Sequence, residues 1–130
     1  MSQEDVELVR RAMEAFNDRD LRTAANALDQ DVEWDSAVLL DEPVIHGRAA
    51  VLEYWERILS TFPFAHENMQ FVEAGDDVCV LADLRALGSG SGVELAQSVG
   101  YAMTVRAGAI IRVRFYRSHA EALEAVELAE

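Results

Sequence analysis

The chain of 130 residues is long enough for one domain with a sizeable core, and a hydrophobic content of 51% argues against a disordered chain. The sequence has 24 acidic and 11 basic residues and a formal net charge of −13, which disfavours nucleic acid and anionic membrane surfaces as partners. Its single cysteine, Cys79, excludes an internal disulfide, and the apolar neighbours of Cys79 predict a buried, unreactive thiol.

The N-terminal half carries three helical patterns. Ser2 and Asp5 have the spacing of a helix-start capping box, and an apolar stripe then recurs at Val6, Val9, Met13 and Phe16. A short second helix is expected to place Leu21, Ala24, Ala25 and Leu28 on one face, followed by a turn at 29–31, a strand at 32–36 and a loop at 37–45. A third helix is expected from Gly47 to about Ser60, with Trp55 on its apolar face.

The C-terminal half changes to an alternating, strand-like pattern. Strands are expected up to Ala74 and at 78–87, 93–106 and 109–116, with a hairpin loop at 88–92 and a tight turn at Ala107 and Gly108. Ser118 and Glu121 form a second capping box that opens a C-terminal helix. Helices packed on an antiparallel sheet make an α+β domain, which we expect to occupy residues 1–130 without an internal repeat.

Five short segments resemble the SnoaL-like branch of the nuclear-transport-factor-2-like superfamily. They lie, in the family's order and spacing, at residues 14–21, 31–34, 46–51, 104–108 and 112–117. The resemblance implies a curved antiparallel sheet wrapped around the N-terminal helices as a cone, with an internal pocket for a small molecule. It also implies a homodimer. Because this superfamily contains isomerases, cyclases, hydrolases, dehydratases and binding modules, the fold does not decide the function.

The ketosteroid isomerases of this fold combine a carboxylate base with two oxyanion donors. Matching their pattern to this chain puts Ala12 at the tyrosine donor and Ser36 at the base, with Asp35 one residue earlier. Tyr101 falls at the second donor, so two of the three groups are missing. Tyr101 and Asp35 are therefore the candidate catalytic residues, with Tyr101 as hydrogen-bond donor and Asp35 as base.

Epoxide hydrolases of this fold use an Asp-Arg-Asp cluster, for which Asp35, Asp83 and Arg85 are the nearest candidates here. The sequence does not place these three side chains in one cavity.

Strand alternation predicts which side chains face the pocket. Gln97, Tyr101 and Met103 share a face of the long strand, and in the last strand Phe115 belongs to the apolar set. Ordinary core packing is the alternative for Tyr101 and for both tryptophans. The residues predicted to bind the ligand are Met13, Phe16, Trp34, Ser36, Trp55, Gln97, Tyr101, Met103 and Phe115.

The opposite face of the long strand carries small side chains, which suit a close contact between two sheets. This face contains Ala96, Ser98, Gly100, Ala102 and Thr104, beside Arg112, Arg114 and Tyr116. We expect a homodimer through this surface, in which Asp83 and Glu94 of one chain meet arginines of the other. An arginine among Arg85, Arg112 and Arg114 that reaches an anionic ligand in the pocket is the alternative.

The sequence indicates no metal and no cofactor, because His46, His66 and His119 are scattered and no nucleotide-binding motif is present. With no signal-peptide pattern and no apolar run of membrane-spanning length, a cytoplasmic location is expected. The predicted function is a binding domain for a small apolar molecule, or a cofactor-free isomerase, cyclase or hydrolase. A non-enzymatic interaction module with a vestigial pocket is the alternative.

Overall fold

The computed structural model describes residues 2–36, 44–86 and 96–128. Its helices and strands follow the order expected from the sequence, with one added short strand, β2. The elements are α1 (Ser2–Asn17), α2 (Leu21–Asn26), β1 (Leu28–Asp35), β2 (Ile45–His46), α4 (Arg48–Thr61), β3 (Phe64–Ala74), β4 (Asp77–Ala86), β5 (Ala96–Arg106), β6 (Ala109–Tyr116) and α5 (His119–Leu128).

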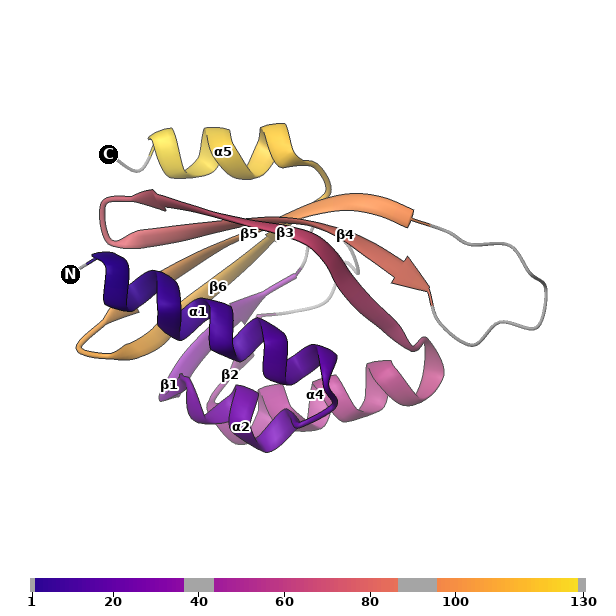
Figure 1. The fold of residues 1–130 in the computed structure, drawn as a ribbon. Helices are drawn as coiled ribbons and strands as arrows, with labels where there is room; N and C mark the ends of the chain where they lie inside the picture. Colours follow the sequence, from indigo (N-terminus) through magenta and orange to yellow (C-terminus); the bar gives the residue numbers. More distant parts are fainter. Residues whose placement is uncertain (1, 37–43, 87–95, 129–130) are drawn as a thin grey trace.

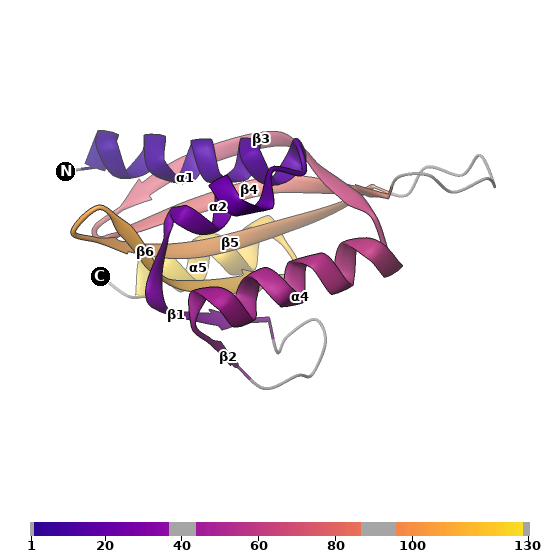
Figure 2. The same ribbon diagram turned by 90° about the horizontal axis from the view of Figure 1, so that it is seen from below.

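The strands form one curved, unclosed sheet in the order β2-β1-β6-β5-β4-β3 (Figure 1). Helices α1, α2 and α4 lie on one side of this sheet and α5 on the other, as Figure 2 shows from below. The predicted α+β class and the sheet wrapped around the N-terminal helices are confirmed. The pairing is mixed rather than fully antiparallel, because β1 runs parallel to β6. All other neighbours are antiparallel.

The main error in the local prediction lies between α2 and β1. Leu28 was expected on the second helix, but α2 ends at Asn26 and Leu28 begins β1. The expected turn at 29–31 is an irregularity inside β1, where the backbone N–H of Asp31 donates to Oδ2 of Asp29 at 2.8 Å. A side-chain acceptor therefore satisfies the backbone locally without ending the strand.

The expected loop at 37–45 lies largely outside the described residues, and its last residue, Ile45, belongs to β2. That strand pairs with β1 through Glu33 opposite His46 and Trp34 opposite Ile45. Gly47 then precedes α4 as its N-cap with a φ of +96°, a conformation that favours glycine.

Both faces of β4 are buried, which explains its continuous apolar run. Val78 and Val80 belong to the core beneath the N-terminal helices, whereas Cys79 and Leu81 belong to a second cluster with Ala102, Ala122 and Val126. Cys79 is fully buried, as predicted, and burial raises the pKa of its thiol to about 11, with a further contribution from nearby Asp77.

The position of α5 corrects the predicted dimer surface. Gly100 and Ala102, which were expected to face a second chain, lie beneath Ala122 of α5. Ala122 and Val126 of this helix are buried. Glu94 lies outside the described residues. The homodimer stays a prediction, and its contact would have to avoid the area that α5 covers.

We predict that Gly100→Ala destabilises the protein by about 1–3 kcal/mol, as overpacking of a filled core does. A Cβ at position 100 would overlap the Cβ of Ala122, and the loss should be partly restored by adding Ala122→Gly. Urea unfolding of both single variants and the double variant measures this coupling.

Gly108→Ala is the matched control. Gly108 has a φ of +78° and open space around it, so its substitution introduces backbone strain without a clash. Ala122→Gly should not relieve that strain. Equal stability losses for Gly100→Ala with and without Ala122→Gly would contradict the packing of α5 on β5.

Candidate functional site

A cavity of about 450 Å³ lies between the N-terminal helices and the inner face of the sheet. This volume falls within the roughly 300–1,000 Å³ range of small-molecule sites. The structure places all nine predicted ligand-binding residues in its lining, from Met13 on α1 to Phe115 on β6. The rest of the lining includes Leu28, Tyr54, Ile58, Phe62, Phe64, His66, Leu84, Ile110 and Val113.

The cavity opens near the C-terminal end of α4. Phe62, the C-cap residue directly after α4, lines the cavity and yet is 58% exposed. Gln97, near the start of β5, is also exposed while lining it. His46 is exposed on β2 and does not belong to the lining. The mouth is therefore formed by the end of α4 and the start of β5.

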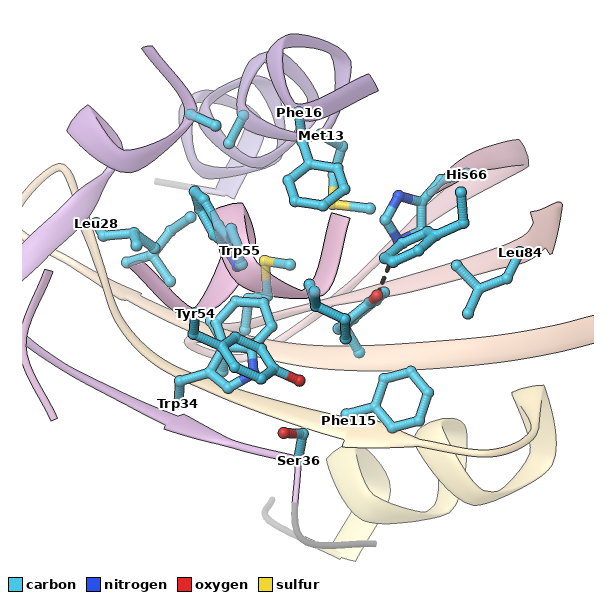
Figure 3. A pocket seen from close by; sticks show the side chains of 18 of the residues that line it. Met13, Phe16, Leu28, Trp34, Ser36, Tyr54, Trp55, His66, Leu84 and Phe115 are labelled. Atoms are coloured by element: carbon cyan, nitrogen blue, oxygen red, sulfur yellow. Dashed lines mark hydrogen bonds between the residues drawn. The ribbon is translucent and has the colours of Figure 1, made fainter. Parts of the chain in front are cut away.

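The inner wall is built of interlocking aromatic rings (Figure 3). Trp55 contacts Phe16 edge-on with ring centroids 5.3 Å apart, and Trp34 contacts Trp55 at 5.7 Å. Such edge-to-face contacts add stability beyond the area that the rings bury. The apolar side chains predicted from helix stripes and strand alternation thus form one continuous surface.

The polar centre of the cavity is a hydrogen-bonded pair, His66 and Tyr101. Nε2 of His66 lies 2.8 Å from the hydroxyl of Tyr101, a contact that Figure 3 marks with a dashed line. Both residues are only 5% exposed. This pair bridges β3 and β5. The match to the ketosteroid isomerase pattern had placed Tyr101 in the site, and the structure adds a histidine beside it.

Asn17, the last residue of α1, holds the backbone of His66 at two points. Oδ1 of Asn17 accepts from the His66 N–H at 2.9 Å, and its Nδ2 donates to the His66 carbonyl at 2.8 Å. Arg19, two residues later, donates to the carbonyl oxygens of Phe16 and Phe64. The end of α1 is therefore attached to the same stretch of β3 that carries the histidine.

Burial keeps both members of the pair uncharged at neutral pH. Burial, with a smaller contribution from the positive charge of Arg19, lowers the pKa of His66 to about 4. Burial also raises the pKa of Tyr101 well above its usual value, with a smaller contribution from Tyr54. A histidine with such a low pKa is a weak base at pH 7, so the pair is better suited to hydrogen bonding than to proton abstraction.

The structure corrects the expected role of Asp35. Trp34 and Ser36 line the cavity, whereas Asp35 between them lies on the opposite face of β1 and does not belong to the lining. Strand alternation requires this arrangement. Because Asp83 and Arg85 are also outside the lining, the structure does not form the Asp-Arg-Asp cluster of the epoxide hydrolases.

The sequence did not decide whether three arginines face the pocket or the outer face of the sheet, and the structure places them on the outer face. Arg85 is paired with Glu67 at 3.0 Å, Arg112 with Glu33 at 3.4 Å, and Arg114 with Asp77 at 3.3 Å. They do not line the cavity, so the described lining offers no cation to an anionic ligand.

His66 was missed because its strand is irregular. Met69 and Phe71 are apolar residues at alternate positions of this strand, and strict alternation from them would point His66 to the opposite face. One extra residue between Glu67 and Gln70 reverses the alternation. A positive-φ asparagine, Asn68, marks that place, but asparagine alone is a weak sequence signal.

Across residues 2–36, 44–86 and 96–128, no three His, Cys, Asp or Glu side chains are grouped as a metal would require. Within the same ranges, the structure has no helix with the length and apolar character needed to cross a membrane.

Comparisons with known proteins agree on the fold. The sequence matches the family model of the SnoaL-like domain over residues 9–113. A search of curated proteins gave no significant match. A proposed polyketide cyclase from Xanthomonas campestris pv. campestris is similar in structure, with a TM-score of 0.79, 24% identity, and coverage of 96% of this chain and 98% of the other.

Two further structures extend this likeness. TerC, co-crystallised with polyporic acid, has a TM-score of 0.73 and 21% identity, with coverage of 95% of this chain and 98% of TerC. A proposed ketosteroid isomerase from Kribbella flavida has a TM-score of 0.73 and 18% identity, with coverage of 88% and 77%. At these identities the comparison establishes the shared fold.

The buried His66 predicts a specific loss of stability in acid. Its pKa of about 4 in the folded protein lies below the ordinary value of 6.5, so the unfolded chain binds the extra proton first. The contribution of neutral His66 to the free energy of unfolding is fully present above about pH 6.5. It falls as the pH approaches 4, by up to about 3 kcal/mol. His66→Phe should therefore gain about that much stability relative to wild type between pH 7 and pH 4.

Urea unfolding at several pH values measures this difference, and exposed His46 supplies the control variant His46→Gln. If the free energy of unfolding changed with pH in the same way for wild type and His66→Phe, His66 would not be buried in its neutral form.

Proposed function

The chain belongs to the SnoaL-like domain family, as its sequence motifs predicted, and on this premise we propose that it binds a small, uncharged, largely apolar cyclic molecule in the cavity. We further propose that Tyr101 donates a hydrogen bond to an oxygen of that molecule. The fold is shared with polyketide-cyclase-like and ketosteroid-isomerase-like proteins, which supports a cofactor-free cyclase or isomerase. The observation that carries the proposal is the His66–Tyr101 pair buried in an apolar cavity.

The composition of the lining supports an uncharged ligand. Its described side chains include no Lys, Arg, Asp or Glu, and His66 is neutral at pH 7. An ion that entered this cavity would lose its hydration without gaining a counter-charge, which is costly. The walls instead offer aromatic and aliphatic surface together with a few polar tips, among them Ser36 and Gln97.

The direction of the hydrogen bond within the pair decides what Tyr101 can do. Nδ1 of His66 is buried and finds no hydrogen-bond partner among the described residues. A buried N–H without a partner is rarer than an acceptor without one. We therefore assign the proton to Nε2, which donates to the Tyr101 oxygen and leaves the hydroxyl proton of Tyr101 free for a ligand.

Such an arrangement favours polarisation of a carbonyl group. A hydroxyl that accepts one hydrogen bond becomes a better donor of another. In a water-poor cavity, a donor aimed at a developing oxyanion contributes about 3–4 kcal/mol to catalysis. Tyr101 would thus assist enolisation, the step that isomerisations and ring closures of carbonyl compounds share. The α-proton would pass to hydroxide or another base from solvent, because the described lining offers no carboxylate to accept it. The cavity volume weighs against the alternative of an interaction module with a vestigial pocket.

A cyclic ketone and its parent hydrocarbon test ligand binding. Both tryptophans of the chain line the cavity, so their fluorescence reports on its occupancy. We predict that 2-tetralone binds about 5–10-fold more tightly than tetralin, because it adds one hydrogen bond of about 1 kcal/mol. Tyr101→Phe should remove most of this preference and leave tetralin binding little changed. No response to either compound would contradict the proposal.

Deuterium exchange tests the chemistry separately. The protein should accelerate exchange of the α-protons of 2-tetralone in D₂O, followed by NMR, and Tyr101→Phe should slow it by roughly two to three orders of magnitude. Tight ketone binding without accelerated exchange would identify a binding protein rather than an enzyme.

A further inference from the structure

Strand β3 contains one residue more than its partner strand requires. Glu67 pairs with Asp83 and Gln70 pairs with Leu81, so three steps along β3 correspond to two steps along β4. Asn68 within this interval has a φ of +53°, a left-handed conformation that asparagine tolerates better than most residues. The interval is therefore a β-bulge, a feature that bends a strand and can redirect a side chain.

The bulge allows β3 to face the cavity layer on both sides of the irregularity. Phe64 and His66, before the bulge, line the cavity. Met69 and Phe71, after it, pack against the same hydrophobic core. Because His66 and Met69 are three residues apart, a regular strand would send them to opposite faces. The extra residue is thus what brings His66 inward.

The bend also shortens the distance between the two members of the pair. On β4, His66 lies opposite Leu84, whereas Tyr101 lies opposite Val80. In a flat sheet this offset of four residues would separate the two backbones by about 13 Å along the strands and about 10 Å across them. The observed contact of 2.8 Å therefore depends on the curvature of the sheet.

A hydrogen-bonded network on the outer face joins the bulge to the two neighbouring strands. Oδ2 of Asp83 accepts from Nδ2 of Asn68 at 2.9 Å, and Oδ1 accepts from the hydroxyl of Ser98 at 3.1 Å. We call Asn68, Asp83 and Ser98 the bulge network. These bonds, that from Asn68 first, lower the pKa of Asp83 and so favour its charged carboxylate, which is a strong acceptor.

We propose that the bulge network positions His66 for its contact with Tyr101, acting through the sheet from the face opposite the cavity. The network joins β3, β4 and β5 on the outer face, and the pair joins β3 to β5 on the inner face. Asp83 is therefore a positioning residue, and it touches neither the pair nor the cavity. The importance of this role for activity rests on the function proposed above, but the positioning itself is measurable in the protein without ligand.

The test observes the His66 ring by ¹⁵N NMR in the ligand-free protein. In the wild type, the bond to Tyr101 should hold one tautomer, with distinct Nδ1 and Nε2 signals and a ring pKa of about 4. Asp83→Ala should partly average the two signals and raise the ring pKa by about one pH unit, because a looser bulge admits water. Urea unfolding of each sample separates this local effect from a general loss of stability.

Two substitutions serve as matched controls. Asp83→Asn keeps an oxygen that accepts from Asn68, so it should retain the wild-type signals of His66. Glu33→Ala breaks an exposed ion pair on the same sheet face, that with Arg112, and should leave the His66 signals unchanged.

Two further variants keep the test decisive if Asp83→Ala folds poorly. Asn68→Gly keeps the left-handed backbone but removes the side-chain bond, and Ser98→Ala removes one donor at an exposed position. Both should shift the His66 signals in the same direction as Asp83→Ala. Wild-type signals in the folded Asp83→Ala, Asn68→Gly and Ser98→Ala variants would overturn the proposal. Failure of the wild type to bind 2-tetralone would instead overturn the proposed function and leave this result standing.

Discussion

A β-strand alternates its side chains between two faces, and the polar centre of the cavity depends on a strand, β3, that breaks this rule. The bulge at Asn68 lets β3 direct Phe64, His66, Met69 and Phe71 to the inner side of the sheet. The same bend adds to the curvature of the sheet, whose edge strand β3 lies beside α1 (Figure 2). A flat sheet would pack directly on the helices and fill the space that the cavity occupies. The polar pair and the open volume therefore have a common origin in the curvature of the sheet.

The outer layer stabilises this curved sheet without entering the site. Helix α5 covers β4 and β5 through Ala122 and Val126. This apolar burial on the far side of the sheet offsets the side-chain contacts that are missing across the open cavity. Towards β1 and β6 the outer face is instead polar, with the pairs of Arg112 and Arg114. Because charged side chains occupy that face and not the cavity, the site stays apolar although the chain carries a net charge of −13. Hydrogen bonds inside such a cavity are stronger than in water, so the single His66–Tyr101 hydrogen bond contributes more there than it would at the surface.

Much of this arrangement could be predicted from the sequence where the local pattern is regular. Strand alternation placed Tyr101, Met103 and Phe115 in the cavity lining, and helix stripes placed Met13, Phe16 and Trp55 there. Prediction failed where tertiary contacts override local preference. Leu28 continues a helical stripe but begins a strand, and β1 pairs in parallel with a strand far along the chain. The small residues Gly100 and Ala102 suit a second chain as well as they suit α5, so the sequence pattern alone could not distinguish the two. His66 was missed because a bulge has almost no sequence signature.

The central claim is that the cavity at the His66–Tyr101 pair is the place where a small apolar molecule binds. Methyl NMR of the methionines tests it within one sample, because Met13 and Met103 line the cavity whereas Met69 packs against the core outside the lining. On titration with 2-tetralone, the methyl signals of Met13 and Met103 should shift together and saturate, while that of Met69 stays nearly constant. Saturable binding that leaves Met13 and Met103 unchanged would place the ligand elsewhere and contradict the account.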